Sequence, residues 1–212
     1  MKKLGIVLVL VFFFVAHHEA SAQLFGIKAG LNLSKIHFEE NNEDFKMNPG
    51  FLIGPTAEFP AGENLAVELG LLLAQKGVQM EDPEFDENTK LTLMYIEVPL
   101  TAKAYFNAGG ARVFGQVGPY AGYGISGKWK VDEFEEDVEW GSDGDIKRFD
   151  FGLLGGVGVD ISNFQLGVNY SFGLANLSPD SDFKQSNRVL GFTVGYKFAM
   201  NLHNVTPKHT II

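Results

Sequence analysis

A strict alternation of apolar with small or polar side chains in residues 188–198 constrains the fold of this chain most. Successive side chains of a β-strand point to opposite sides, so the two sets would form two different faces. The apolar face would carry Leu190, Phe192, Val194, Tyr196 and Phe198. The other face would carry Gly191, Thr193, Gly195 and Lys197. Two architectures fit this pattern: a soluble barrel or sandwich with the apolar face inward, and a membrane barrel with the apolar face outward.

The same alternation recurs in seven earlier segments of the chain. These are residues 25–34, 51–59, 65–77, 93–106, 112–126, 149–161 and 164–174. The 212-residue chain shows no break in composition that would divide it. We therefore expect one all-β domain of eight strands.

The connections between these segments alternate in length. Short turns such as Ser162-Asn163 alternate with long polar segments near 37–48, 80–90, 127–147 and 175–187. In an up-and-down barrel, all the tight turns then lie at one end and all the long loops at the other, as in outer-membrane barrels. Strands of about 11 residues tilted near 45° would stand roughly 25 Å tall, which matches the apolar band of such barrels. The sequence therefore predicts an eight-stranded antiparallel up-and-down transmembrane β-barrel.

Charged residues on the second face favour the membrane arrangement. The interior of an eight-stranded barrel has room for side chains only, so glycines and a few compensating charges suit it. Four lysines and five carboxylates nearly cancel, as buried charges must. We expect an interior charge network, with closure of the sheet between residues 188–198 and 25–34. The predicted network consists of Lys28, Glu58, Glu68, Lys76, Glu97, Lys103, Asp150, Asp160 and Lys197.

The first 22 residues are typical of a secretory signal peptide. Lys2 and Lys3 precede an apolar run that is too short to span a membrane, and Ala20-Ser21-Ala22 is a small-x-small cleavage pattern. We expect a signal peptide over 1–22, a barrel domain over 23–199 and a tail over 200–212. Cleavage removes two lysines and one glutamate, which changes the net charge from −9 to −10. This acidity argues against nucleic-acid binding, and the lack of cysteine excludes disulfides and thiol chemistry.

Four stretches of the barrel segments resemble the PorT-like outer-membrane β-barrel family of Gram-negative bacteria. They are FGIKAGLNLSKI, ELGLLLAQKG, YIEVPLTAKAYF and LGFTVGYKF, spread over the whole mature domain. The resemblance implies an eight-stranded barrel in the outer membrane. It implies no shared catalytic residues.

Catalytic and metal sites find little support in the residues. The mature chain contains only His37, His203 and His209, so no histidine-based catalytic group can be assembled at the loop end. We therefore predict no catalytic residues and no cofactor.

The acidic residues 132–137 with Asp143 and Asp145 could attract a divalent cation. Their spacing does not match an EF-hand, and most such acidic runs are only solvated, so we predict no metal site. Four loop residues could contact a partner or pack the loops together. They are Pro83, Phe85, Phe134 and Trp140.

We therefore expect a monomeric, non-enzymatic protein in the lipid of the outer membrane, with acidic external loops and a structural, adhesion or secretion-associated role. An unidentified protein partner would bind through the long loops. The alternative is a soluble secreted barrel whose apolar face encloses a lipid-like ligand. A small channel is a third possibility.

Overall fold

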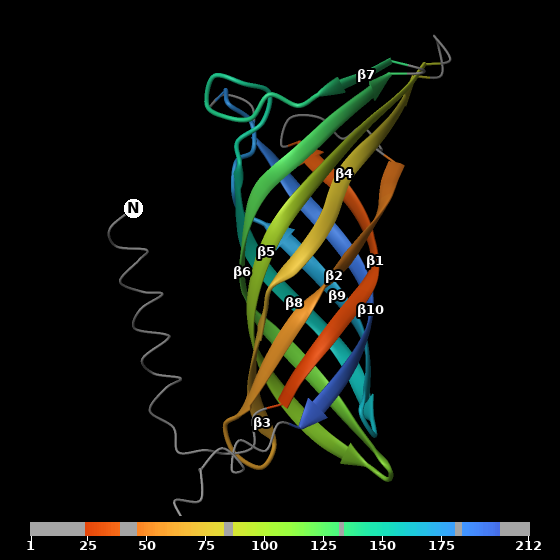
Figure 1. The fold of residues 1–212 in the computed structure, drawn as a ribbon, viewed down its shortest axis with the longest axis vertical. Coiled ribbons are helices and arrows are strands. Elements are labelled where there is room, and N and C mark those ends of the chain that lie inside the picture. The colour runs from red at the N-terminus through yellow and green to blue at the C-terminus, as the bar shows by residue number, and fades with distance from the viewer. Residues whose placement is uncertain (1–23, 39–45, 83–86, 132–133, 181–183, 200–212) are drawn as a thin grey trace, which may run out of the picture.

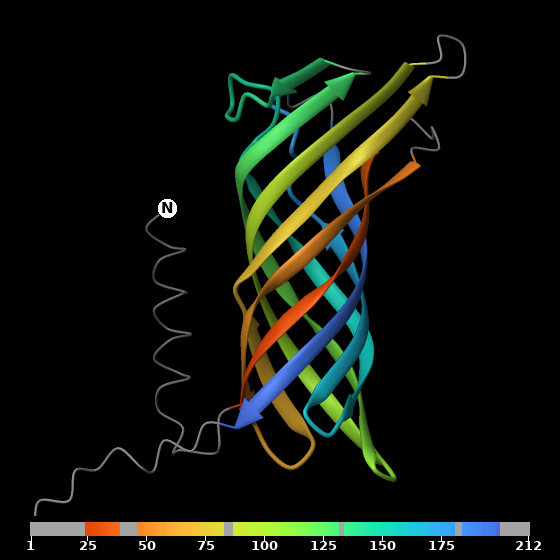
Figure 2. The same ribbon diagram turned by 45° about the vertical axis from the view of Figure 1, so that its right-hand side comes forward.

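The structure is a computed structural model that describes residues 24–38, 46–82, 87–131, 134–180 and 184–199. The signal peptide predicted at 1–22 and the tail predicted at 200–212 lie outside these ranges. The chain folds into one antiparallel sheet (Figures 1 and 2). Its strands are β1 Leu24–Phe38, β2 Lys46–Pro60, β3 Leu65–Gly70, β4 Leu72–Asp82, β5 Glu87–Ala108, β6 Ala111–Val131, β7 Phe134–Asp137, β8 Phe149–Ile161, β9 Phe164–Gly173 and β10 Gln185–Ala199.

The sheet closes because β1 pairs with both β2 and β10. The β1–β10 register runs from Leu24 opposite Ala199 to Phe38 opposite Gln185, so this closing pair is hydrogen-bonded along the full length of both strands. Each of the other barrel strands pairs with its neighbours along the chain. The predicted eight-stranded antiparallel up-and-down barrel is confirmed. No helix among the described residues has the length and apolar character to cross a bilayer.

Strands β3 and β4 together form the third barrel strand, which is interrupted at Leu71. The register with β2 is the same on both sides of the interruption, and the Leu71 amide still donates to the Pro55 carbonyl at 3.0 Å. Pro55 on β2 lies opposite Leu71, and Pro99 on β5 lies opposite Gly70. Proline has no N–H, so each neighbouring strand lacks one ladder donor at this point.

The long-loop end contains more strand than the sequence pattern predicts. Residues 127–131 continue β6, and Phe134–Asp137 form β7 on the same edge of β6 that β8 occupies further down. The prediction of a continuous loop over 127–147 is therefore wrong in this part. The reason is that β5 and β6 remain paired up to Thr89 opposite Val131, beyond the apolar alternation. Strands β4, β5, β6 and β7 rise above the rest of the barrel (Figures 1 and 2).

The two faces of the wall differ as the alternation predicts. Exposed apolar side chains cover the outside, for example Leu31 at 65%, Val157 at 62% and Phe149 at 65% of their full area. Side chains on the inside are buried and largely polar. The alternative of a soluble barrel with the apolar face inward is therefore wrong.

The tight turns lie together at one end of the barrel, where β1 begins and β10 ends (Figure 2). Ser162 adopts φ 54° in the β8–β9 turn, and Gly109 adopts φ 65° in the β5–β6 turn. Both values belong to the left-handed region that tight hairpin turns require. The long connections and β7 lie at the opposite end.

Candidate functional site

The barrel interior contains a network of ionisable side chains that come from both halves of the sheet. All nine residues assigned to it from the sequence point inward, and only Lys197 is more than one-tenth exposed, at 13% of its side-chain area. They form two groups. The turn-end cluster contains Lys28, Glu58, Glu68, Lys103, Asp160 and Lys197, and the loop-end cluster contains Lys76, Glu97 and Asp150.

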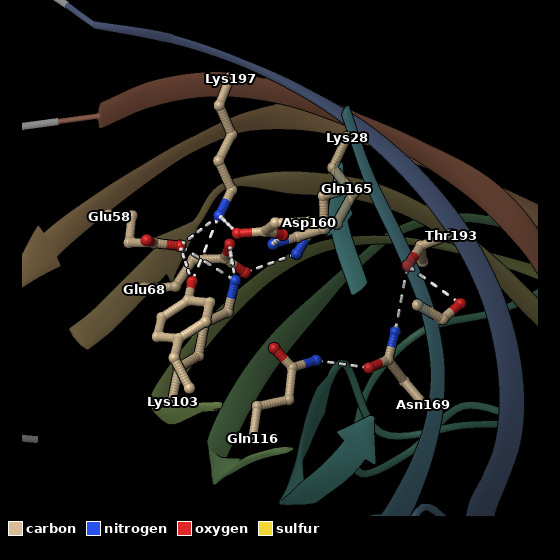
Figure 3. A network of polar contacts seen from close by, with 12 residues as sticks. Lys28, Glu58, Glu68, Lys103, Gln116, Asp160, Gln165, Asn169, Thr193 and Lys197 are labelled. Atoms are coloured by element: carbon tan, nitrogen blue, oxygen red, sulfur yellow. Dashed lines mark hydrogen bonds and ion pairs between the residues drawn. The ribbon is translucent and has the colours of Figure 1, made fainter. Parts of the chain in front are cut away.

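In the turn-end cluster, two carboxylates of β2 and β3 share the lysines of three other strands (Figure 3). Glu68 accepts hydrogen bonds from the ammonium groups of Lys28 and Lys103, each at 2.5 Å. Glu58 accepts hydrogen bonds from Lys103 at 3.2 Å and from Lys197 at 2.8 Å. The Tyr105 hydroxyl donates to Glu58 at 2.8 Å. Each carboxylate therefore has two cationic partners.

Lys197 extends this cluster to the turn between β8 and β9. Its ammonium group also donates to Asp160 at 2.7 Å, and Gln165 donates to the other oxygen of Asp160 at 3.0 Å. Three lysines and three carboxylates thus balance in the turn-end cluster, which satisfies the requirement that buried charges be paired.

The loop-end cluster is centred on Lys76. Its ammonium group pairs with Glu97 and lies 3.0 Å from Asp150. Asp150 accepts further hydrogen bonds from Asn187 at 2.9 Å and from the Tyr120 hydroxyl at 3.3 Å. The same ammonium group lies 4.5 Å from the centre of the Tyr120 ring, a cation–π distance.

A neutral polar layer separates the two clusters. The Gln116 side chain donates a hydrogen bond to Asn169, and the Asn169 side chain donates one to the Thr193 hydroxyl at 3.4 Å (Figure 3). The space that remains between Lys28, Lys76 and this layer has a volume of about 40 Å³. On this measure of volume one water needs about 10–15 Å³, so the cavity has room for only a few water molecules among the side chains that fill the described interior.

An apolar cap closes the loop end of the interior. Five of its buried members lie on strands, namely Ile36, Val78, Leu91, Leu93 and Tyr95. Four come from the long connections, namely Val138, Ile146, Ala175 and Leu177. Trp140 packs against the cap with its ring 5.9 Å from that of Tyr95. No periodic pattern in the sequence predicts this cap, and its only signal is the isolated apolar residues inside acidic loops.

The loop residues singled out from the sequence separate into different environments. Trp140 packs inward on the cap, whereas Phe134 on β7 is 81% exposed. Pro83 and Phe85 lie outside the described residues. Asp145 accepts from the Glu139 amide at 2.9 Å. In the described part of the chain, no three histidine or carboxylate side chains come together as metal ligands would.

Comparison with family models identifies the class of barrel. The model described as "Outer membrane protein beta-barrel domain" matches residues 19–179, which is more than half of the chain. The chain belongs to this outer-membrane β-barrel family. This membership places the protein in the outer membrane, with its exposed apolar belt in the lipid. A comparison with curated protein sequences gave no match.

Solved outer-membrane barrels have a similar chain path. Neisserial surface protein A is 12% identical with a TM-score of 0.50, over 82% of this chain and 97% of its own. Ail, the attachment invasion locus protein of Yersinia pestis, is 20% identical with a TM-score of 0.45, over 84% of this chain and 100% of its own. Outer membrane protein W of E. coli is 16% identical with a TM-score of 0.42, over 85% and 100%. At these identities, the likeness to the Neisserial protein supports the barrel fold alone.

Proposed function

We propose that this outer-membrane barrel is a non-enzymatic, PorT-like surface protein that acts by presenting its acidic loop end to a partner outside the cell, in adhesion or in secretion. The filled interior carries the proposal. Paired charges, the neutral layer and the apolar cap occupy the interior, so the polar surface available for function is the loop end.

The extension formed by β4, β5, β6 and β7 is the part of the loop end best suited to contact a partner. Strand β7 is exposed at all four positions, and Glu135, Glu136 and Asp137 give it negative charge. Phe134 adds a large exposed aromatic side chain, a residue type that dominates the binding energy of many interfaces. Paired strands hold these groups in place, which lowers the entropy lost on binding.

Two measurements test this proposal. Purified protein in planar bilayers should give no stepwise conductance, and a stable ion channel would contradict the surface role. Cells that display the full chain should bind an external partner, and cells that display a Phe134→Ala/Glu136→Lys variant should not bind it. A matched Phe106→Ala variant at the turn end should retain it, because Phe106 is 70% exposed on the opposite rim. Equal retention by all three would overturn the assignment to β7.

A further inference from the structure

A pocket between the β6–β8 connection and the start of β8 combines two cations with an apolar wall. Lys147 and Arg148 line it together with Phe149 and Phe151, and its volume is ≈ 370 Å³. Phe149 is 65% exposed and Phe151 is 53% exposed, so both rings lie on the outer, lipid-facing surface. The pocket therefore opens where the barrel wall meets the loops.

Aromatic side chains place this pocket at the level of the lipid headgroups. The Phe149 ring contacts the Tyr123 ring on the neighbouring strand β6, edge to face, at 5.1 Å between centroids. Both are exposed on the outside at the loop end of the wall. Outer-membrane barrels carry aromatic girdles at the two membrane interfaces, and the long loops emerge at the external one.

The two cations of the pocket have no anionic partner in the described ranges. No carboxylate forms an ion pair with either of them there, and none lines the pocket. This is unusual in a chain of net charge −9. Arg148 donates from one nitrogen to the Gly124 carbonyl at 3.1 Å, which fixes the guanidinium and leaves other N–H groups available. Its central carbon also lies 5.6 Å from the Trp140 ring.

Two more cations continue this basic surface around the barrel. Arg188 on β10 stacks on the exposed Phe172 ring at 3.5 Å, and Lys35 lies opposite it on β1. Both residues share the outward side of the wall, and neither has a carboxylate partner among the residues the structure describes. Basic side chains at a membrane surface attract anionic lipids, and arginine suits the geometry of phosphate.

We propose that Lys147 and Arg148 bind the phosphate group of an anionic lipid in the external leaflet, with its acyl chain lying on Phe149 and Phe151. The cations supply charge complementarity, and the phenylalanines continue the lipid-facing belt. The lipid is thereby held beside the cap, because Arg148 also contacts Trp140.

The full chain in zwitterionic micelles tests this, with Trp140 fluorescence as the readout in a Trp129→Phe background. Titration with phosphatidylglycerol should give a saturable change. Lys147→Gln and Arg148→Gln should each weaken binding roughly fivefold. The matched control, Lys128→Gln/Lys130→Gln, removes two cations from the extension and should leave the affinity unchanged. Arg148→Lys should retain part of the binding, and heat-modifiable migration reports folding of each variant.

Three results would overturn the proposal. The first is a response that does not saturate. The second is equal weakening by the control variant. The third is that soluble glycerol phosphate binds as tightly as the lipid, which would make the pocket a site for free phosphate instead. Lys147→Gln decides the outcome if Arg148 variants fold poorly, because the Lys147 side chain forms no hydrogen bond, ion pair or ring contact with the residues that the structure describes.

Discussion

Lys197 Nζ lies 2.8 Å from Glu58 Oε2. This ion pair connects β10, the last strand of the barrel, to β2, although β1 lies between them in the sheet. Glu58 also accepts from Lys103 on β5, so one carboxylate connects three strands that are not hydrogen-bonded to one another. The backbone ladder holds only neighbouring strands. The interior network therefore opposes sliding between distant parts of the wall.

Replacing Lys103 with methionine should destabilise the barrel strongly. Lys103 is 1% exposed, and its removal leaves Glu58 and Glu68 each with one cation fewer in a buried site. Removing one partner of a buried ion pair costs about 3–5 kcal/mol. Urea unfolding in lipid vesicles measures the change.

A double variant and an exposed pair control this experiment. Adding Glu68→Gln to Lys103→Met should recover part of the loss, because it leaves two lysines and two carboxylates in the turn-end cluster and so restores the charge balance. Lys128→Met breaks an exposed ion pair with Glu135 and should leave the unfolding midpoint unchanged. Equal effects of Lys103→Met and Lys128→Met would show that the interior network adds nothing to stability.

Replacing Gly124 with valine should displace the apolar cap. A Cβ at Gly124 would lie 2.2 Å from the Trp140 ring, so the ring has to move. Overpacking of this kind costs about 1–3 kcal/mol. The expected result is faster protease cleavage within 138–146 and a red shift of Trp140 fluorescence. Gly110→Ala is the control, since a Cβ there has nothing within 4 Å, and it should change neither readout.

The alternation of side chains, together with the alternating lengths of the connections, was sufficient to predict the barrel, because lipid outside and a polar interior impose period two on every strand. It was not sufficient for the break at Leu71. The alternation continues through Leu69, Leu71 and Leu73, and the cause lies in Pro55 and Pro99 on other strands. It also could not predict the extension, because strands outside the membrane need no apolar face.

The same limit applies to the interior. The inward side of each charged residue could be assigned from its own strand, but the partners could not, since Lys76 and Asp150 are 74 positions apart. The pairing depends on the stagger of the strands. The cap was missed because its loop members, such as Val138 and Ile146, have no periodic context.

Replacing Val194 with arginine should prevent insertion. Val194 is 47% exposed on the apolar belt near the middle of β10. A lipid-facing arginine costs roughly 2–4 kcal/mol at the bilayer midplane. The variant should remain in the soluble precursor fraction, as measured by recovery from outer membranes. Phe134→Arg lies on the external extension and should insert normally, and its failure would show that the assay reports general misfolding.

The β6–β7 pairing should depend on pH through Lys128 and Glu135, which lie outside the membrane-spanning part. Their hydrogen bond at 3.0 Å raises the pKa of Lys128 above 10.5 and lowers the pKa of Glu135 below 4.5. The contribution of Glu135 is therefore present above pH 4.5 and is lost as the pH falls through its lowered pKa. The contribution of Lys128 to the β6–β7 pairing is present below pH 10.5 and is lost as the pH rises through its raised pKa.

NMR shifts of β7 amides measure this dependence. They should be constant between these limits and change on the acid side, and Glu135→Gln should abolish the acid-side change attributable to this pair. Glu139→Gln is the control, because Glu139 uses its backbone amide and carbonyl in the bonds to Asp145. A change that persists in Glu135→Gln would assign the dependence to another carboxylate.

The closing pair of strands has a consequence for protein engineering. Leu24 and Ala199 are register partners, so the chain enters and leaves the barrel at adjacent points on one rim. A peptide linker of a few residues could therefore join these two positions, and new termini could be opened in the connection between β6 and β8. Such a circular permutant would keep every strand pair while moving both chain ends to the other side of the membrane.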